Sequence, residues 1–248
     1  MKGAGSTAES PSLRFPEGFL WGAALASHQV EGGNTNNNWY RWEEAGRTAH
    51  RSGAACGCWS ARWAEDLDRA AVAGQNAHRL SIDWSRIQPA RDRWDDGALD
   101  RYRDILRGLR NRGMALMVSL HHFTDPLWLG ELGGWDTQAV LPLFAEYTRR
   151  AVGALGDLCS LWCTINEPNI YAIEGYLRGN FPPGKRDIGL SFEVQANLAR
   201  AHAAAYRIIH ELQPKARVGY ALHFRPQEPA SRFNPLDRLA SSLRFASK

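Results

Sequence analysis

One short stretch of the chain, residues 161–169, combines an apolar strand pattern with a carboxylate. The sequence Leu-Trp-Cys-Thr-Ile-Asn-Glu-Pro-Asn is a buried-strand pattern that leads directly into Glu167. Pro168 cannot donate a hydrogen bond to a neighbouring strand, so we expect the strand to end at Glu167. Active sites of α/β sheets lie at the carboxyl ends of strands, where a carboxyl group can donate or accept a proton. The alternative is a strand end with one solvated Glu.

This stretch resembles the acid/base motif of the family-one glycoside hydrolases, the β-glucosidase family, in which Thr-Ile/Leu-Asn-Glu-Pro ends the fourth barrel strand. The resemblance implies that Glu167 is the general acid/base and that Asn166 donates a hydrogen bond to the sugar 2-hydroxyl. Glycoside cleavage needs a carboxylic acid to protonate the leaving oxygen, and contacts at the 2-hydroxyl strengthen in the transition state. Such an acid needs a raised pKa, which desolvation in a barrel mouth lined with aromatic side chains can supply.

Two earlier segments resemble the first two strands of the same family. Residues 15–24 form a turn and a short apolar strand, and Gln29-Val-Glu-Gly follows, as in the family's Gln-x-Glu-Gly. The resemblance implies that Gln29 binds sugar hydroxyls; a Gln that only supports its loop is the alternative. Residues 76–87, Asn-Ala-His-Arg-Leu-Ser-Ile-Asp-Trp-Ser-Arg-Ile, resemble the second strand. Arg79, Ser81 and Asp83 alternate with apolar residues and should share one face. The resemblance implies that Arg79 supports the nucleophile carboxylate.

A third segment ends in two histidines. Residues 114–120 are an apolar strand, typical of a parallel sheet covered on both sides, and His-His-Phe-Thr-Asp-Pro follows. By alignment on Pro126, the resemblance implies that His122 binds the sugar 3-hydroxyl. His121, His122 and Asp125 also suggest a metal site. Neighbouring strand residues face opposite ways, however, so both histidines cannot easily bind one ion and we predict no metal.

The remaining segments alternate between strand and helix patterns, which is typical of parallel βα units. We therefore predict an α/β fold, an incomplete (β/α)8 TIM barrel with about five of its eight parallel strands. Residues 1–13 are predicted to be a disordered leader and residues 14–248 a single truncated barrel domain. Helices are expected at 60–74, 96–112 and 191–212 and from Asp136 or Thr137 to Gly156, strands at 160–167 and 216–224, a loop at 171–185, and a further helix beginning near Asn234.

The family's nucleophile motif, Thr/Ile-x-Glu-Asn-Gly, does not occur in this sequence. A retaining glycosidase needs two carboxyl groups roughly 5–5.5 Å apart, and only the first is in its expected place. Asp83 is the best substitute because it is expected on the face of Arg79, while Glu31 and Glu174 are weaker candidates. Five parallel strands also leave two sheet edges and an apolar interior to be covered. We therefore expect self-association or a partner chain that covers the open barrel.

Bulk composition excludes several functions. The chain has 248 residues, 44% of them hydrophobic, and a net charge of +4 without long basic runs, which argues against nucleic acid as a partner. No apolar run approaches the roughly 18 residues of a membrane span. The four cysteines have no disulfide or zinc spacing, so we predict a reduced, cytoplasmic protein. Nothing in the sequence calls for a metal or another cofactor.

Three functions follow from these features. The first is a weak β-glucosidase that hydrolyses small glycosides with Glu167 as general acid and direct attack by water, and whose preference for β- over α-anomers is relaxed. The second is a non-catalytic sugar-binding protein that keeps Gln29, His122 and Asn166. The third is a half-enzyme that needs a C-terminal partner chain.

Overall fold

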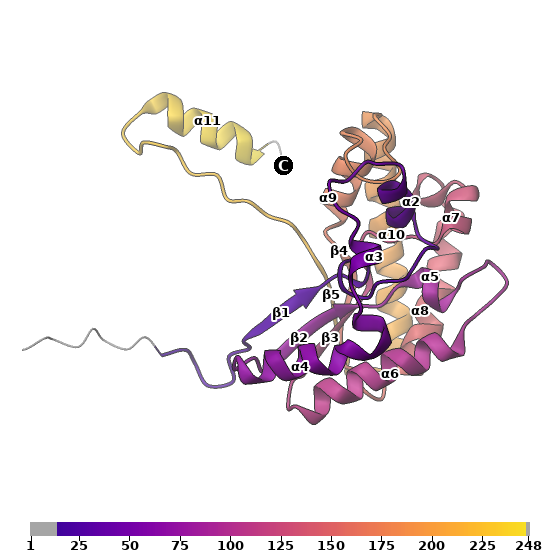
Figure 1. Cartoon of the computed structure of the whole chain (residues 1–248). Helices are drawn as coiled ribbons and strands as arrows, with labels where there is room; N and C mark the ends of the chain where they lie inside the picture. Colours follow the sequence, from indigo (N-terminus) through magenta and orange to yellow (C-terminus); the bar gives the residue numbers. More distant parts are fainter. Residues whose placement is uncertain (1–13, 247–248) are drawn as a thin grey trace, which may run out of the picture.

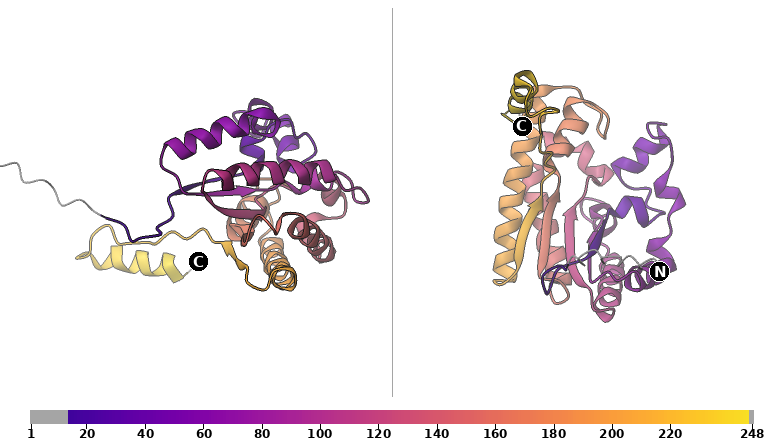
Figure 2. Two further views of the ribbon diagram at one scale, coloured as in Figure 1. Left: turned by 90° about the horizontal axis from the view of Figure 1, so that it is seen from below. Right: turned by 90° about the vertical axis from the view of Figure 1, so that its left-hand side faces the viewer.

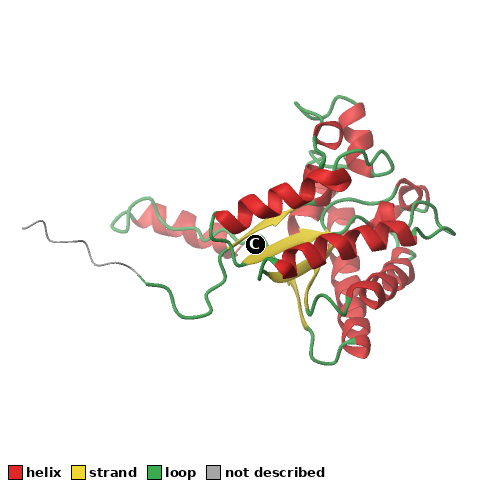
Figure 3. Cartoon of the chain, turned by 60° about the horizontal axis from the view of Figure 1, so that its bottom comes forward, coloured by secondary structure: helices red, strands yellow, loops and turns green. Residues whose placement is uncertain are grey.

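The structure is a computed structural model that describes residues 14–246. The predicted leader, residues 1–13, lies outside the described residues. Five strands form one parallel sheet in the order β1-β2-β3-β4-β5, as the strand–helix alternation predicts (Figure 1). Figure 3 shows these strands at the centre of the body with helices around them. Their bounds are Gly22–Leu25 for β1, Ala77–Ser81 for β2, Ala115–His121 for β3, Leu161–Asn166 for β4 and Arg217–Ala221 for β5.

Helices connect each strand to the next. The long ones are α4 (Trp63–Val72), α6 (Asp96–Asn111), α8 (Val140–Leu155) and α10 (Ile188–Leu212). Shorter helices lie mostly at the carboxyl ends of the strands. They are α1 (Ser27–Val30), α2 (Asn38–Glu44), α3 (Ser52–Ala55), α5 (Trp84–Ile87), α7 (Leu127–Glu131) and α9 (Pro168–Ala172), with single turns η1 (Cys58–Arg62), η2 (Gly134–Asp136) and η3 (Ile173–Leu177). Helix α11 (Pro235–Ala246) follows β5.

The long helices form where the sequence supplies a cap and an apolar face. Asp95 begins α6 by accepting a hydrogen bond from the backbone N–H of Ala98, and Asp187 begins α10 in the same way. Apolar side chains spaced three and four residues apart then bury one face of α6 against the sheet. In α10, Ala201 and Ala205 are fully buried, which lets this helix pack closely on α8.

Several predicted boundaries are wrong. The strand expected at 216–224 ends at Ala221, and three other boundaries differ for a local reason. β4 ends at Asn166 and not at Glu167, because Glu167 adopts a left-handed conformation with φ 44° as the chain turns into α9. The helix expected to be capped by Asp136 or Thr137 begins at Val140, because residues 134–136 form a separate 3-10 turn. The expected loop at 171–185 begins in α9 and contains η3.

Both edges of the sheet are open within the described chain, because β1 and β5 each pair on one side only. Apolar side chains lie exposed near both edges. Tyr220 lies in β5 and Leu222 directly after it, and Phe15, Phe19 and Trp21 form an aromatic cluster beside β1. Both views of Figure 2 show an extended segment leading from β5 to α11, and Figure 1 shows α11 standing off the body. None of the described helices has the length and apolar character needed to cross a membrane.

Leu106 tests the packing of α6 on the sheet because its side chain is fully buried in the core. We expect Leu106→Ala to lower the free energy of unfolding by about 2–5 kcal/mol, through lost apolar burial and the cavity left behind. Urea denaturation measures this change. Val72→Ala is the control, because Val72 is 89% exposed and should change stability by about 0.5 kcal/mol or less. Equal effects of the two substitutions would contradict the packing described here.

Candidate active site

Glu167 stands at the junction of β4 and α9 with its carboxylate only partly enclosed. Its backbone N–H donates to the Ala221 carbonyl at 2.6 Å, which ties the junction to the end of β5. Its side chain is 31% exposed, and Oε1 lies 3.3 Å from His223 Nδ1. Positive φ in a residue other than glycine is strained and is common at functional sites. The carboxylate is therefore anchored through its backbone and remains accessible to a substrate.

Asn166 and Arg79 meet across the carboxyl end of the sheet. Asn166 is 3% exposed, and its Oδ1 accepts a hydrogen bond from Arg79 Nη2 at 2.7 Å. Arg79 alternates with His78 and Leu80, which face helices α4 and α6, so Arg79 points to the opposite, inward face. Its Nε is buried and has no hydrogen-bond partner among the described residues. The guanidinium therefore has a free donor beside Asn166.

His122 belongs to the same group of side chains. Burial, together with the nearby positive charge of Arg79, lowers the pKa of His122 to about 3, so the imidazole is neutral at neutral pH. Its Nδ1 is also buried without a partner in the described chain. His121, in contrast, has its Nε2 3.1 Å from Asp125 Oδ1. The two adjacent histidines therefore face different surroundings.

Gln29 lies apart from this group in the described structure. It is in α1, directly beyond the carboxyl end of β1, and its side chain is exposed. Because the strands are parallel, this is the same edge of the sheet that carries Glu167. Gln29 makes no hydrogen bond to Glu167, Asn166 or His122 within the described chain.

The three candidate replacement nucleophiles, Asp83, Glu31 and Glu174, all accept hydrogen bonds from other residues. The expectation that Asp83 continues the face of Arg79 is wrong, because β2 ends at Ser81 and the fully buried Asp83 caps α5 by accepting from Ser85. Glu31 accepts hydrogen bonds from Arg86 and Tyr102, each at 2.7 Å, and burial raises its pKa to about 7. Glu174 pairs with Arg178 and Asn180.

Two contributors to the site carry no clear signal in the sequence. Asp125 is 7% exposed and receives hydrogen bonds from Trp135 at 2.8 Å and Tyr171 at 2.6 Å, besides its contact with His121. His223 lies just beyond β5, and its Nε2 accepts from Arg225 at 2.8 Å. The hydrogen therefore sits on Nδ1, which faces Glu167. The contacts of Asp125 with Tyr171 and of His223 with Glu167 join residues far apart in sequence, and the local hints are the His-His-Phe-Thr-Asp pattern around Asp125 and a polar residue soon after β5.

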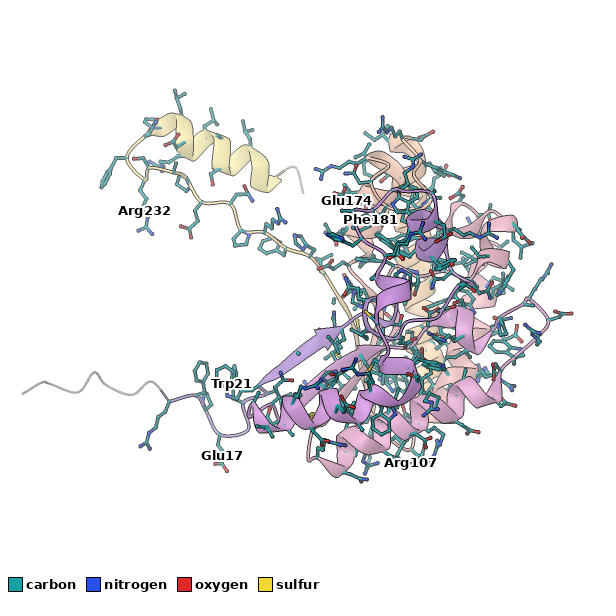
Figure 4. The ribbon with its side chains drawn as sticks, viewed as in Figure 1. Glu17, Trp21, Arg107, Glu174, Phe181 and Arg232 are labelled. Atoms are coloured by element: carbon teal, nitrogen blue, oxygen red, sulfur yellow. The ribbon has the colours of Figure 1, made fainter. Side chains whose placement is uncertain are left out.

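An aromatic cluster stands beside these polar groups. The rings of Trp39 and Phe181 lie 5.0 Å apart, and those of Phe123 and Phe181 lie 5.6 Å apart. Figure 4 shows Phe181 and Glu174 together, close to α2 and α9. The Asn-rich segment before α2 thus leads into this aromatic cluster, because α2 carries Trp39.

Comparison with known proteins decides the family. The sequence profile described as Glycosyl hydrolase family 1 matches residues 12–247. The chain belongs to this family. It is 36% identical to beta-glucosidase A of Thermotoga maritima, over 88% of this chain and 51% of that protein, and 31% identical to human cytosolic beta-glucosidase, over 88% and 50%. A beta-glycosidase from Pyrococcus horikoshii superposes with a TM-score of 0.85 at 38% identity, over 94% of this chain and 53% of that one.

The comparisons also explain the open sheet. The chain spans about half the length of the curated relatives it matches. Its five parallel strands with their helices correspond to part of a family 1 TIM barrel. Both the predicted family and the predicted incomplete barrel are confirmed.

The pKa of His122 provides a test of the site's geometry. Because its folded-state pKa is about 3 and the ordinary value about 6.5, the unfolded chain binds the extra proton first on acidification. The contribution of His122 to stability is therefore full above about pH 6.5 and is lost as pH falls toward 3. We expect Arg79→Met to raise this pKa, because a nearby positive charge is removed. NMR titration of the imidazole C–H signals measures it.

The control for this titration is Arg107→Met. Arg107 lies on the exposed side of α6, away from the strand ends, as Figure 4 shows. This change should leave the His122 titration unaltered. An equal pKa of His122 in the native chain and Arg79→Met would show that Arg79 is not beside it.

Proposed function

We propose that this chain hydrolyses β-glucosides with Glu167 as the general acid/base. The observation that carries the proposal is the convergence of strands β2, β3 and β4, whose carboxyl ends bring together Arg79, His122 and Asn166, with Glu167 next in the chain. Relatives named beta-glucosidase support the substrate class. Gln29 is proposed as a further sugar contact because it lies at the same edge of the sheet.

The hydrogen bonding of Asn166 supports its proposed part. Its Oδ1 is already used to accept from Arg79, which leaves the amide hydrogens free to donate. A donor here suits a sugar 2-hydroxyl, whose contacts strengthen in the transition state. Neutral His122 carries one ring N–H and one acceptor nitrogen, so it can bind a second hydroxyl in either direction.

The proton transfer requires one carboxyl group and one water molecule. Protonated Glu167 gives its proton to the glycosidic oxygen as the bond to the anomeric carbon breaks. Water adds to that carbon and loses a proton to the resulting Glu167 carboxylate, which restores the acid. We propose direct attack by water in the isolated chain, because Asp83, Glu31 and Glu174 are held in other contacts. Without a fixed nucleophile, discrimination between α- and β-anomers is relaxed.

A half-enzyme is the second candidate, and Arg79 favours it. Its buried Nε lacks a partner within the described chain, and a guanidinium so placed suits a carboxylate. The two open sheet edges would let another chain bring that carboxylate to the inward face. In this case Glu167 supplies the proton and the partner chain supplies the nucleophile. The sugar-binding alternative keeps the same hydroxyl contacts without turnover.

The cytoplasmic location remains a proposal. It is supported by the four cysteines, all of which are free thiols in the structure. Burial raises the pKa of Cys58 and Cys159 to about 11, which makes these two thiols poor nucleophiles at neutral pH.

The first test compares p-nitrophenyl β- and α-glucosides as substrates for the native chain and for Glu167→Gln. We expect the substitution to lower kcat about 10²–10⁴-fold, because the amide cannot transfer the proton. Glu174→Gln is the matched control, since it removes a carboxylate from the same region without touching the proposed site. Hydrolysis unaffected by Glu167→Gln would refute the proposed acid. Glucose binding without hydrolysis, measured by calorimetry, would favour the sugar-binding alternative.

The second test addresses the open edges. We propose that the chain self-associates or binds a partner through them, because unpaired strands beside exposed apolar side chains favour pairing with another chain. Sedimentation at micromolar concentration should show a species larger than the monomer. Tyr220→Lys combined with Leu222→Lys should reduce it, whereas the control Val72→Lys should not. A monomer at every concentration would rule out self-association.

A further inference from the structure

A cavity of about 360 Å³ lies on the outer side of the sheet, away from the proposed active site. It runs between strands β1 and β2 and helices α4 and α6. Its walls are largely apolar, formed by Trp63, Leu67, Ala70, Leu80, Ile105 and Leu109. None of Glu167, Asn166, Arg79 or His122 lines it. The cavity is therefore a separate space, for which the proposed glycosidase chemistry has no use.

Two buried polar atoms on the cavity wall have no partner in the described chain. His78 is 6% exposed, and its Nδ1 makes no hydrogen bond. The Oε1 atom of Gln75, in the turn before β2, is likewise buried and unpaired. Both residues line the cavity near the amino-terminal end of β2. A buried polar atom without a partner costs free energy, so such atoms mark a place for another hydrogen-bonding group.

The chemistry of these atoms defines what binds. Gln75 Oε1 accepts only, so the ligand must donate a hydrogen bond to it. Burial lowers the pKa of His78, which keeps the ring neutral and removes any preference for an anion from this residue. Glu31 also lines the cavity, but Arg86 and Tyr102 already occupy its two oxygens. Asp66 and Arg69 line the cavity too, and they pair with each other at 2.6 Å. The group that meets Gln75 Oε1 must donate, and a neutral donor such as a hydroxyl avoids the cost of burying a charge.

The volume defines the size of the ligand. A cavity of roughly 150 Å³ lined by apolar side chains holds benzene. The present cavity, at about 360 Å³, is more than twice as large and also lies within the range of small-molecule sites. Two fused aromatic rings fit this space, and the side chain of Trp63 offers an aromatic surface for contact with them.

We propose that this cavity binds a neutral bicyclic aromatic molecule with a hydroxyl group, whose rings contact the apolar walls and whose hydroxyl donates to Gln75 Oε1 beside His78. Water alone does not suit the apolar part of the space, because an ordered water needs two to four polar partners and the side chains of Leu67, Ile105 and Leu109 offer none. The site is independent of the proposed hydrolysis, so it can be tested whether or not the chain is a glycosidase.

The test uses 2-naphthol as the probe and 2-methoxynaphthalene as the matched molecule that cannot donate. Calorimetry on the full chain, supported by quenching of tryptophan emission, measures both. We expect 2-naphthol to bind about tenfold more tightly, which corresponds to one hydrogen bond to a buried acceptor. This preference should disappear in Gln75→Leu, which removes the acceptor and leaves no other hydrogen bond unmade. Glu167→Gln should bind 2-naphthol as the native chain does.

A second pair of variants tests the location. Ala70→Trp fills the cavity from α4 and should abolish binding, whereas Val72→Trp, on the exposed side of the same helix, should not. Thermal unfolding of each variant verifies that it is folded. The proposal is overturned if 2-naphthol does not bind to the native chain, if both molecules bind equally, or if folded Ala70→Trp still binds. It is also overturned if Glu167→Gln abolishes binding, because the probe would then occupy the proposed active site.

Discussion

The mouth of the incomplete barrel depends on one buried carboxylate. Asp125 is 7% exposed, and its oxygens receive hydrogen bonds from Asn38 of α2, Trp135 of η2 and Tyr171 of α9, besides contacting His121 of β3. A carboxylate removed from water must be compensated by such contacts, or burying it would cost several kcal/mol. The donors come from segments distant in sequence, so satisfying Asp125 also fixes how these segments meet.

Glu167 has the opposite surroundings, and this contrast supports its proposed chemistry. Asp125 has several donors and little exposed surface, whereas Glu167 faces one imidazole at 3.3 Å and is 31% exposed. The oxygens of Asp125 are already used to accept from Asn38, Trp135 and Tyr171. The carboxylate of Glu167 remains open to a substrate. The position of α9 couples the two, because Tyr171 donates to Asp125 and its backbone N–H donates to the Glu167 carbonyl at 3.0 Å.

The sequence predicted the strands and the inward face of Arg79 because apolar runs and alternation are local properties. It placed Glu167 one residue too far inside its strand, since a left-handed turn in a residue other than glycine has no compositional signature. Asp83 was expected on the strand face of Arg79, but it caps helix α5. The sequence pattern alone does not distinguish a carboxylate that caps a helix from one that lies in a strand. The contacts of Asp125 and His223 could not be predicted either, because they depend on how separate βα units pack.

The positive charge of Arg79 is incompletely paired on the inward face of the open sheet. A barrel strand presents alternate side chains to the interior, and a charged one there requires a partner. Asn166 satisfies one Nη of Arg79, but its neutral oxygen cannot balance the charge, and Nε remains unpaired in the described chain. The same charge helps to keep His122 neutral. The five strands thus hold the proposed acid, the 2-hydroxyl donor and an unbalanced cation on one face. Another polypeptide that covers that face, whether a second copy of the chain or a different one, is therefore expected to place a carboxylate beside Arg79.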